Sequence, residues 1–262
     1  MYEITAKNIS IEFPVYTSQR RSIRHALFID KVKNALDRSG GSGVGGRIGH
    51  DSEGRTIINA LEDLTFSIRQ GDRVGLIGLN GSGKTTLLRV MSGIYEPPKG
   101  ELVVRGQVMP LFNINEGIDM DATGVEAIQT RGILLGLSRQ QIEDCIQDII
   151  EFSDLGNYID MPIRTYSAGM LVRLAFATAT AVHPEILLMD EVIGAGDATF
   201  IEKAEARLKT FVEAAGIVVV ASHSRDILQR WCNKAILLHQ GRMIEFSDVD
   251  TVIEAYDRLV AG

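Results

Sequence analysis

A glycine-rich segment, GLNGSGKT, carries residue types that bind phosphate. Glycines at this spacing let backbone N–H groups close around phosphate oxygens, because no Cβ blocks the approach. The segment lies between the strand-like RVGLI and the helical pattern KTTLLRVMSG, which is the context that a phosphate loop requires. The Lys84 ammonium is placed to reach the β- and γ-phosphates of a nucleotide, and the Thr85 hydroxyl to bind Mg²⁺. We predict loop contacts from Gly78, Leu79, Asn80, Gly81, Ser82, Gly83, Lys84, Thr85 and Thr86.

Two adjacent carboxylates end an apolar segment about a hundred residues later. The segment ILLMDE predicts a buried strand that finishes at Asp190 and Glu191. Paired acids after a strand are usually a solvated strand end, but behind a phosphate loop they indicate hydrolysis. Asp190 then holds Mg²⁺ through water together with Thr85, and Glu191 is the catalytic residue that polarises the attacking water.

A third segment, YSAGM at residues 166–170, precedes the helical pattern LVRLAFATATAV. Taken alone, its serine predicts only a helix cap, although a helix N-terminus also attracts anions. The segment resembles the signature motif of ATP-binding cassette (ABC) ATPases, usually LSGGQ. Ser167 and Gly169 match that motif, and the other three positions depart from it. The resemblance implies that Ser167 and Gly169 contact the γ-phosphate of an ATP bound to a second copy of the chain.

Two further positions match the same family. Asp197, six residues beyond Glu191, resembles the aspartate of the D-loop. His223 follows the strand-like VVVAS and resembles the switch histidine, which the family uses to contact the γ-phosphate and the attacking water. Without the resemblance, a lone histidine after a strand is more often structural.

The family's glutamine and its adenine-stacking aromatic have less specific counterparts. The segment PLFNINEGI places Asn113 or Asn115 where the family carries glutamine. Phe13 or Tyr16 resembles the aromatic residue that stacks on adenine. An ordinary core aromatic is an equal alternative for each of them.

The elements that position these residues predict an α/β domain. Strand-like segments near residues 73–77, 186–189, 217–220 and 235–238 alternate with helix-length segments, as in a mostly parallel sheet. The first sixteen residues alternate as strands, and residues from about 113 to 165 read as helices. We predict an α/β P-loop NTPase of the ABC ATPase type over residues 1–262. It has a mixed, mostly parallel sheet, an inserted helical lobe and a small N-terminal β subdomain.

Residues 17–55 interrupt the strand pattern and form an insertion. Its first half predicts a basic amphipathic helix, and its second half, SGGSGVGGRIG, predicts a flexible loop. Such a helix is either a solvated face or a membrane-proximal element. Its cations are Arg20, Arg21, Arg24, Lys31 and Lys33.

Composition narrows the classes of function. The chain has 262 residues, 45% of them hydrophobic, and a net charge of −7, which opposes a general nucleic-acid surface. It contains no apolar stretch of about 18 residues and no signal-peptide pattern at its N-terminus. Cys145 and Cys232 lack partners at metal-ligand spacing, so we assign them no function.

The resemblance covers nearly the whole chain and is strongest to the ATPase subunits of O-antigen and capsule polysaccharide exporters. It rests on NISIEFPVY, the basic insertion, YSAGM and EVIGAGDATF. It implies an ATP- and Mg²⁺-dependent homodimer at the cytoplasmic face of the inner membrane. An integral membrane subunit and a lipid-linked polysaccharide are also implied. Family members that recognise a capped polymer carry a C-terminal carbohydrate-binding domain, and we expect none in this chain. The alternatives are a drug or lipid exporter, or a soluble ABC ATPase acting on ribosomes or DNA. The soluble ATPase predicts two cassettes in one chain or a long coiled coil, together with a basic surface, and this sequence shows none of these features.

Overall fold

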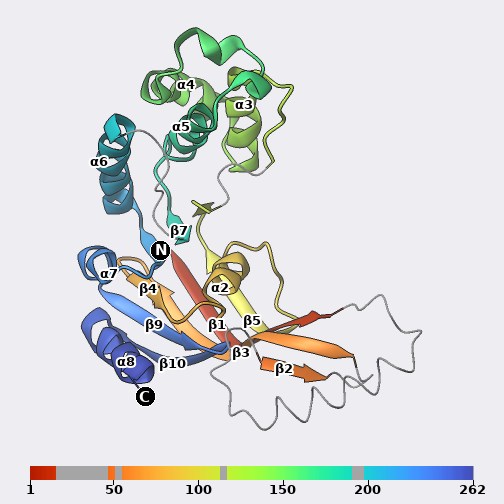
Figure 1. The fold of residues 1–262 in the computed structure, drawn as a ribbon, viewed down its shortest axis with the longest axis vertical. Coiled ribbons are helices and arrows are strands. Elements are labelled where there is room, and N and C mark those ends of the chain that lie inside the picture. Colours follow the sequence, from red (N-terminus) through yellow and green to blue (C-terminus); the bar gives the residue numbers. More distant parts are fainter. Residues whose placement is uncertain (16–46, 51–54, 113–116, 191–197, 262) are drawn as a thin grey trace.

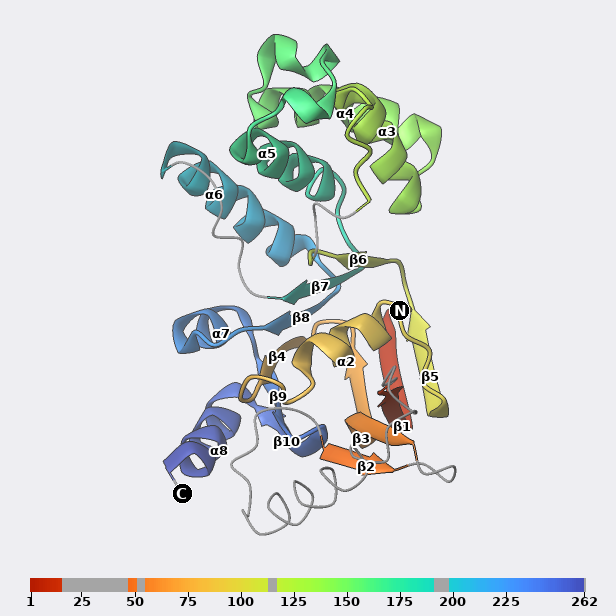
Figure 2. The ribbon, with the colours of Figure 1, turned by 45° about the vertical axis from the view of Figure 1, so that its right-hand side comes forward.

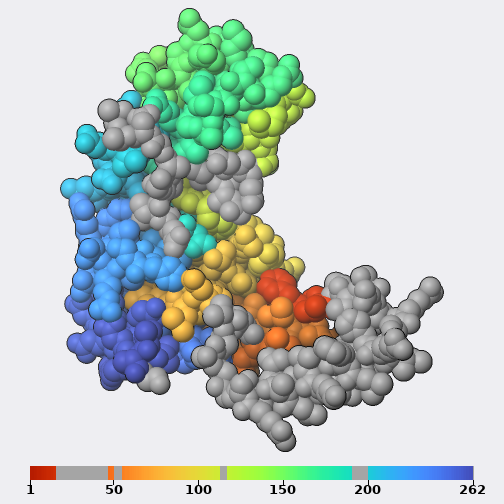
Figure 3. Space-filling view, viewed as in Figure 1, coloured from red at the N-terminus to blue at the C-terminus, as the bar shows by residue number. Residues whose placement is uncertain are grey.

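The computed structural model describes residues 1–15, 47–50, 55–112, 117–190 and 198–261. These residues form two sheets, from which a helical lobe projects at one end of the molecule (Figures 1 and 3). Among the helices of this part of the chain, none is both long and apolar enough to cross a membrane.

The larger sheet has six strands in the order β10-β9-β4-β8-β7-β6. The pairs β9–β4, β4–β8, β8–β7 and β7–β6 are parallel, whereas β10 is antiparallel to β9. This arrangement confirms the predicted mixed, mostly parallel sheet. The strands are β4 (Arg73–Ile77), β6 (Val108–Pro110), β7 (Ile186–Asp190), β8 (Ile217–Ala221), β9 (Lys234–His239) and β10 (Arg242–Asp248).

Alternate residues of the central strands face two different hydrophobic cores. Leu187 and Val218 pack into the core shared with the helical lobe. Their neighbours Leu188 and Val219 pack into the core beneath the smaller sheet. Both faces of the parallel strands are therefore buried, which explains their continuous apolar sequences.

The smaller sheet is antiparallel and has the order β2-β3-β1-β5, as predicted for an N-terminal β subdomain. Its side chains Ile4, Ile9, Leu61 and Ile68 are fully buried. The strand-like ELVVRG belongs to this sheet. The strands are β1 (Glu3–Pro14), β2 (Arg47–His50), β3 (Thr56–Arg69) and β5 (Lys99–Arg105).

The prediction of a flexible loop is wrong for residues 47–49, because they lie in β2. Arg47 pairs with Asn59 and Ile48 with Ile58, so the backbone groups of β3 gain hydrogen-bonding partners along one more edge. Residues 17–46 of the insertion, including all five of its predicted helical cations, lie outside the described residues.

Helices α3, α4 and α5 form the helical lobe, together with two short 3₁₀ helices (Figure 2). Ser138 and Gln141 form a reciprocal capping box that begins α4. Gly132 lets α3 approach α4 closely, since a Cβ built there would lie 2.6 Å from Cγ1 of Ile142. The lobe elements are α3 (Gly124–Leu134), α4 (Arg139–Ser153), η1 (Gly156–Asp160), η2 (Ile163–Thr165) and α5 (Ala168–Ala179).

Four more helices pack around the sheets. Helix α2 follows β4 and packs between the two sheets (Figure 2). Helix α6 lies between β7 and β8 in the chain, and α7 and α8 lie on the side of the molecule where the chain ends (Figures 1 and 2). They are α2 (Lys84–Met91), α6 (Ala198–Ala214), α7 (Arg225–Trp231) and α8 (Val249–Ala261).

Candidate nucleotide-binding site

The glycine-rich loop connects the end of β4 to the start of α2, as the motif requires. Gly83 precedes α2 with φ of 109°, a left-handed conformation that favours glycine. A Cβ built at Gly83 would lie 2.8 Å from the carbonyl oxygen of Ala60, so the loop packs tightly against β3. Because glycine has no capping side chain, the first N–H groups of α2 remain open to an anion.

Lys84 is buried beneath this loop, with 8% of its surface exposed. Its ammonium donates hydrogen bonds to the carbonyl oxygens of Gly78, at 2.7 Å, and Leu79, at 3.1 Å. These bonds hold the positive charge at the centre of the loop, where a phosphate group would meet it.

The two predicted metal ligands contact each other directly. The Thr85 hydroxyl, in the first turn of α2, donates a 2.6 Å hydrogen bond to a carboxylate oxygen of Asp190 at the end of β7. Both residues lie at the carboxyl edge of the parallel strands, where ligands of open α/β sheets bind. A hydroxyl beside a carboxylate is an oxygen donor set that suits Mg²⁺.

A cleft of about 570 Å³ opens above the loop. The hydroxyl oxygen of Ser82 is buried in the loop and does not line the cleft. The lining instead combines the Lys84 ammonium, the Thr85 hydroxyl and the Asp190 carboxylate, which complement a phosphate group and its Mg²⁺. The residues therefore fit a nucleotide. The cleft is lined by Phe13, Ala60, Asn80, Gly81, Gly83, Lys84, Thr85, Thr86, Phe112, Asp190, Ala221, Ser222 and His223.

The turn between β9 and β10 supports the phosphate loop from below. The N–H of Gly241 donates to the carbonyl oxygen of Ser82 at 3.0 Å, and the N–H of Glu62 donates to the carbonyl oxygen of Gly241 at 2.8 Å. Arg242 pairs with the Glu62 carboxylate through two hydrogen bonds, and Arg47 of β2 lies 3.5 Å from it. The hydrogen bond from Arg242 is the main cause that lowers the pKa of Glu62. Sequence reasoning missed Gly241, although a glycine between two strands signals a hairpin turn.

Two aromatic side chains of the described residues line the cleft. One is Phe13, near the end of β1, which the family resemblance links to adenine stacking. Its ring packs edge-on against Tyr95 with a centroid separation of 5.4 Å. Phe112 also lines the cleft and was missed, although it directly precedes the position predicted for the family's glutamine.

His223 also lines the cleft and follows β8. Asp190, the candidate metal ligand, pairs with Ala221 across the parallel strands β7 and β8. His223 therefore lies only two residues beyond the neighbour of Asp190. Ser222 is buried, and its hydroxyl accepts a hydrogen bond from the N–H of Ser224 at 3.1 Å. This turn presents the imidazole, which is exposed, to the cleft.

The signature segment lies elsewhere in the chain. Ser167 is the N-cap of α5, and its hydroxyl accepts a 3.2 Å hydrogen bond from the N–H of Met170. Ser167 and Gly169 are exposed and are absent from the described lining of the cleft. One chain therefore brings together the phosphate loop, Asp190 and His223, but not the signature residues.

Five candidate positions lie outside the described residues. They are Tyr16, Asn113, Asn115, Glu191 and Asp197. Glu191 directly follows Asp190, and Asp197 directly precedes α6. The roles assigned to these five positions stay predictions.

Comparison with known proteins identifies the family. Residues 61–194 match the model of the ABC transporter family, ABC_tran. The chain is 40% identical to the O-antigen export system ATP-binding protein RfbE of Yersinia enterocolitica, across 94% of this chain and 98% of the relative. It is 35% identical to the teichoic acids export ATP-binding protein TagH of Bacillus anthracis, across 77% of this chain but only 36% of that longer protein.

A solved structure shares the fold. It is the dimeric post-hydrolysis state of an ATP-binding cassette bound to ADP and Pi, with a TM-score of 0.63 at 20% identity. The alignment covers 94% of this chain and 98% of that one. With the family match over residues 61–194 and a relative aligned over nearly its full length, this chain belongs to the ABC transporter family.

Proposed function

We propose that this chain is the ATP-hydrolysing subunit of an ABC transporter that exports a lipid-linked polysaccharide of the O-antigen or capsule type across the cytoplasmic membrane. The observation that best supports ATPase activity is the contact between Thr85 and Asp190 beside the phosphate loop. The polymer class is supported by 40% identity to an O-antigen export protein and 35% identity to a teichoic acids export protein.

The described residues account for nucleotide binding. Lys84 and the N-terminus of α2 supply positive charge to the phosphates, and Thr85 and Asp190 would hold Mg²⁺. Bound Mg²⁺ neutralises charge that develops on the phosphate oxygens during transfer. His223 faces the same cleft and is placed to contact the γ-phosphate, while Glu191 is assigned to polarise the water.

A second copy of the chain completes the site in this proposal. Ser167 and Gly169 stand at an exposed helix N-terminus away from the lining of their own cleft. Free N–H groups and a partial positive charge at that terminus suit a γ-phosphate held by a partner. The dimeric assembly of a cassette with the same fold supports this arrangement.

The membrane partner and location are also part of the proposal. We infer that the chain sits at the cytoplasmic face of the inner membrane, bound to an integral membrane subunit. The cations of residues 17–55 are assigned to that contact, since basic residues beside a membrane are attracted to anionic lipid. A net charge of −7 disfavours a nucleic-acid partner.

Complementation tests the composite site. Lys84→Ala removes the phosphate contact of one chain, and Ser167→Arg blocks the signature end of the other. Each variant alone should be inactive, whereas mixed dimers, purified through a different tag on each chain, should recover ATPase activity because one of their two sites is intact. Stable mixed dimers without any recovered activity would refute the head-to-tail arrangement.

A further inference from the structure

Three helices meet where the helical lobe joins the rest of the molecule. Each contributes one phenylalanine: Phe152 from α4, Phe176 from α5 and Phe200 from α6. The ring centroids lie 5.7 to 6.1 Å apart, in tilted or edge-on pairs, and all three residues are buried. We call this cluster the three-helix junction. Its apolar contacts hold α4, α5 and α6 together but do not by themselves fix the angle of each helix.

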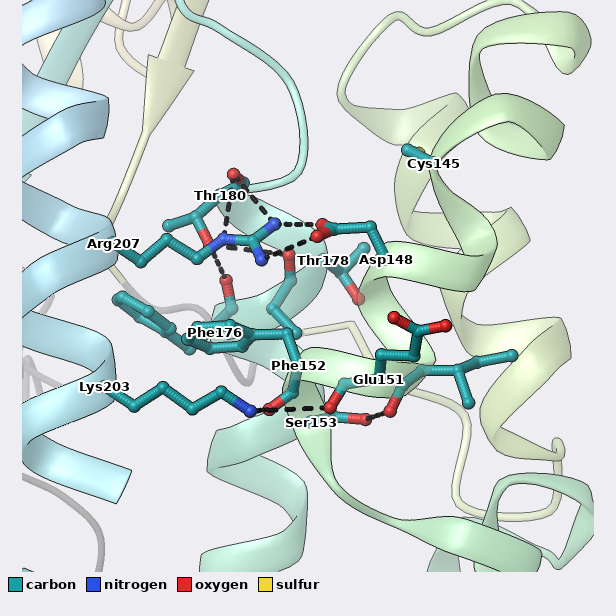
Figure 4. Close-up of polar contacts among 12 residues, drawn as sticks. Cys145, Asp148, Glu151, Phe152, Ser153, Phe176, Thr178, Thr180, Lys203 and Arg207 are labelled. Carbon is teal, nitrogen blue, oxygen red and sulfur yellow. Dashed lines mark hydrogen bonds and ion pairs between the residues drawn. The ribbon is translucent and has the colours of Figure 1, made fainter. Parts of the chain in front are cut away.

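Two cations of α6 reach across this junction. Figure 4 shows Lys203 and Arg207 extending from α6 toward α4 and α5. The Lys203 ammonium lies 4.8 Å from the ring centroid of Phe152, and the Arg207 guanidinium lies 4.3 Å from it. Both separations are within the range of cation–π attraction.

The Lys203 ammonium bonds the last turn of α4. It donates to the carbonyl oxygen of Phe152 at 3.1 Å and to that of Glu151 at 3.5 Å. These carbonyls belong to the final residues of α4, which lack partners within the helix. A positive charge at this end is also favoured by the helix dipole.

The Arg207 guanidinium joins α4 and α5 at once. Its Nε and Nη2 donate to the carbonyl oxygen of Thr180, the C-cap of α5, at 3.3 and 3.2 Å. Its two terminal nitrogens also pair with both carboxylate oxygens of Asp148 on α4. The planar fork therefore orients the C-terminal end of α5 relative to α4 and α6.

The other end of α5 carries the signature residues. A helix of 12 residues is a rigid rod of about 18 Å, so an angular error at its C-terminal end displaces its N-terminal end. We propose that Arg207, assisted by Lys203, is a positioning residue that aims Ser167 and Gly169 at the nucleotide of the partner chain. This inference rests on the composite site of the proposed function. Neither residue touches a reacting atom: Arg207 acts through α5 and α4, and Lys203 through the last turn of α4.

Stability alone is a poor explanation of this arrangement. The Asp148 side chain is 57% exposed, and exposed ion pairs contribute little to folding. The Arg207 side chain is only 17% exposed, and its guanidinium makes hydrogen bonds to two different helices, which constrains geometry more than an apolar side chain of similar size could.

Mixed dimers with one live site test the inference. In the Lys84→Ala and Ser167→Arg pair, the Lys84→Ala chain donates the signature end and the Ser167→Arg chain donates the phosphate loop. Arg207→Gln is added to one chain or to the other. In the signature donor it should lower kcat about tenfold, or about 1.4 kcal/mol of barrier, with KM for ATP unchanged. In the phosphate-loop donor it should leave kcat unchanged.

A control and a milder variant complete the experiment. Lys209→Gln removes a cation of the same helix that forms an ion pair with Glu213 of α6 itself, so kcat should stay unchanged with the variant in either chain. Asp148→Asn changes a side chain that is 57% exposed, so it should cost little stability. It should lower kcat in the signature donor only, by less than Arg207→Gln does, and it replaces Arg207→Gln if that variant does not fold.

The outcomes distinguish the positioning role of Arg207 from the composite site. An equal loss of kcat whichever chain carries Arg207→Gln, or no loss when the signature donor carries it, would refute the positioning role but not the composite site. An inactive parent pair overturns the composite site, and this inference falls with it.

Discussion

Gly241→Ala should weaken nucleotide binding although Gly241 is not among the residues that line the cleft. The φ of Gly241 is 81°, and an alanine in this left-handed conformation costs about 1–2 kcal/mol. Its Cβ would lie 2.8 Å from the carbonyl oxygen of Ala60, so the turn must move away from β3. That movement lengthens the 3.0 Å hydrogen bond to Ser82. Loss of one such bond, at about 1 kcal/mol, predicts a Kd for MgATP about fivefold higher.

Gly71→Ala is the matched control, because it carries the same backbone cost without the collision. Gly71 has φ of 90°, and in the described structure a Cβ there would meet no heavy atom within 4 Å. Both variants should lower Tm, Gly71→Ala by about 2–4 °C per kcal/mol and Gly241→Ala by more. Calorimetric titration with MgATP then separates them, since only Gly241→Ala should change Kd. A wild-type Kd in folded Gly241→Ala would show that this turn does not support the phosphate loop.

Three other outcomes are expected. Lys84→Ala should abolish ATP binding, whereas Glu191→Gln should bind ATP but not hydrolyse it. Wild-type ATP affinity of Lys84→Ala, or substantial ATPase activity of Glu191→Gln, would contradict these roles. Burial raises the pKa of the Cys232 thiol to about 12, above its value of about 8.5 when unfolded, so its contribution to stability is complete below pH 8.5 and is lost as pH rises toward 12. Between pH 8.5 and 12 the urea midpoint of the wild type should thus fall more steeply than the urea midpoint of Cys232→Ala. Parallel curves for the two proteins would contradict the raised pKa of Cys232. Replacing the five insertion cations by glutamine should preserve ATP affinity but reduce polysaccharide display in cells. Normal display by a well-folded protein would refute the membrane-side role. The five residues are Arg20, Arg21, Arg24, Lys31 and Lys33.

The parts of the site that sequence reasoning found are local in the chain. The phosphate loop and the strand ending at Asp190 each combine a short motif with a strand pattern, so neighbouring residues alone predict them. The parallel sheet follows from strands that alternate with helices. Even the Thr85–Asp190 contact could be anticipated, because strand ends of a parallel sheet share one edge.

The missed features depend on contacts between distant segments. β2 looked like a continuation of the Gly/Ser-rich stretch because its strand conformation depends on pairing with β3. The support of Ser82 by Gly241 joins residues far apart in the sequence. A glycine between two strands signals a hairpin turn, but nothing near it signals that the turn contacts the phosphate loop. The three-helix junction is similar, since Phe152, Phe176 and Phe200 each look like ordinary core residues of separate helices.

The departure of the signature segment from the family pattern has a structural account. Tyr166 stands where the family carries leucine, and its hydroxyl donates a 2.7 Å hydrogen bond to the carbonyl oxygen of Tyr158 in η1. Burial raises the pKa of Tyr166, so its hydroxyl keeps the proton that this bond requires. A Cβ built at Gly124 would lie 2.4 Å from that hydroxyl, which explains the glycine at the start of α3. Tyr166 therefore anchors α5 at the end that presents Ser167, while Arg207 anchors the opposite end. A helix held at both ends can change direction only if the lobe and α6 move with it.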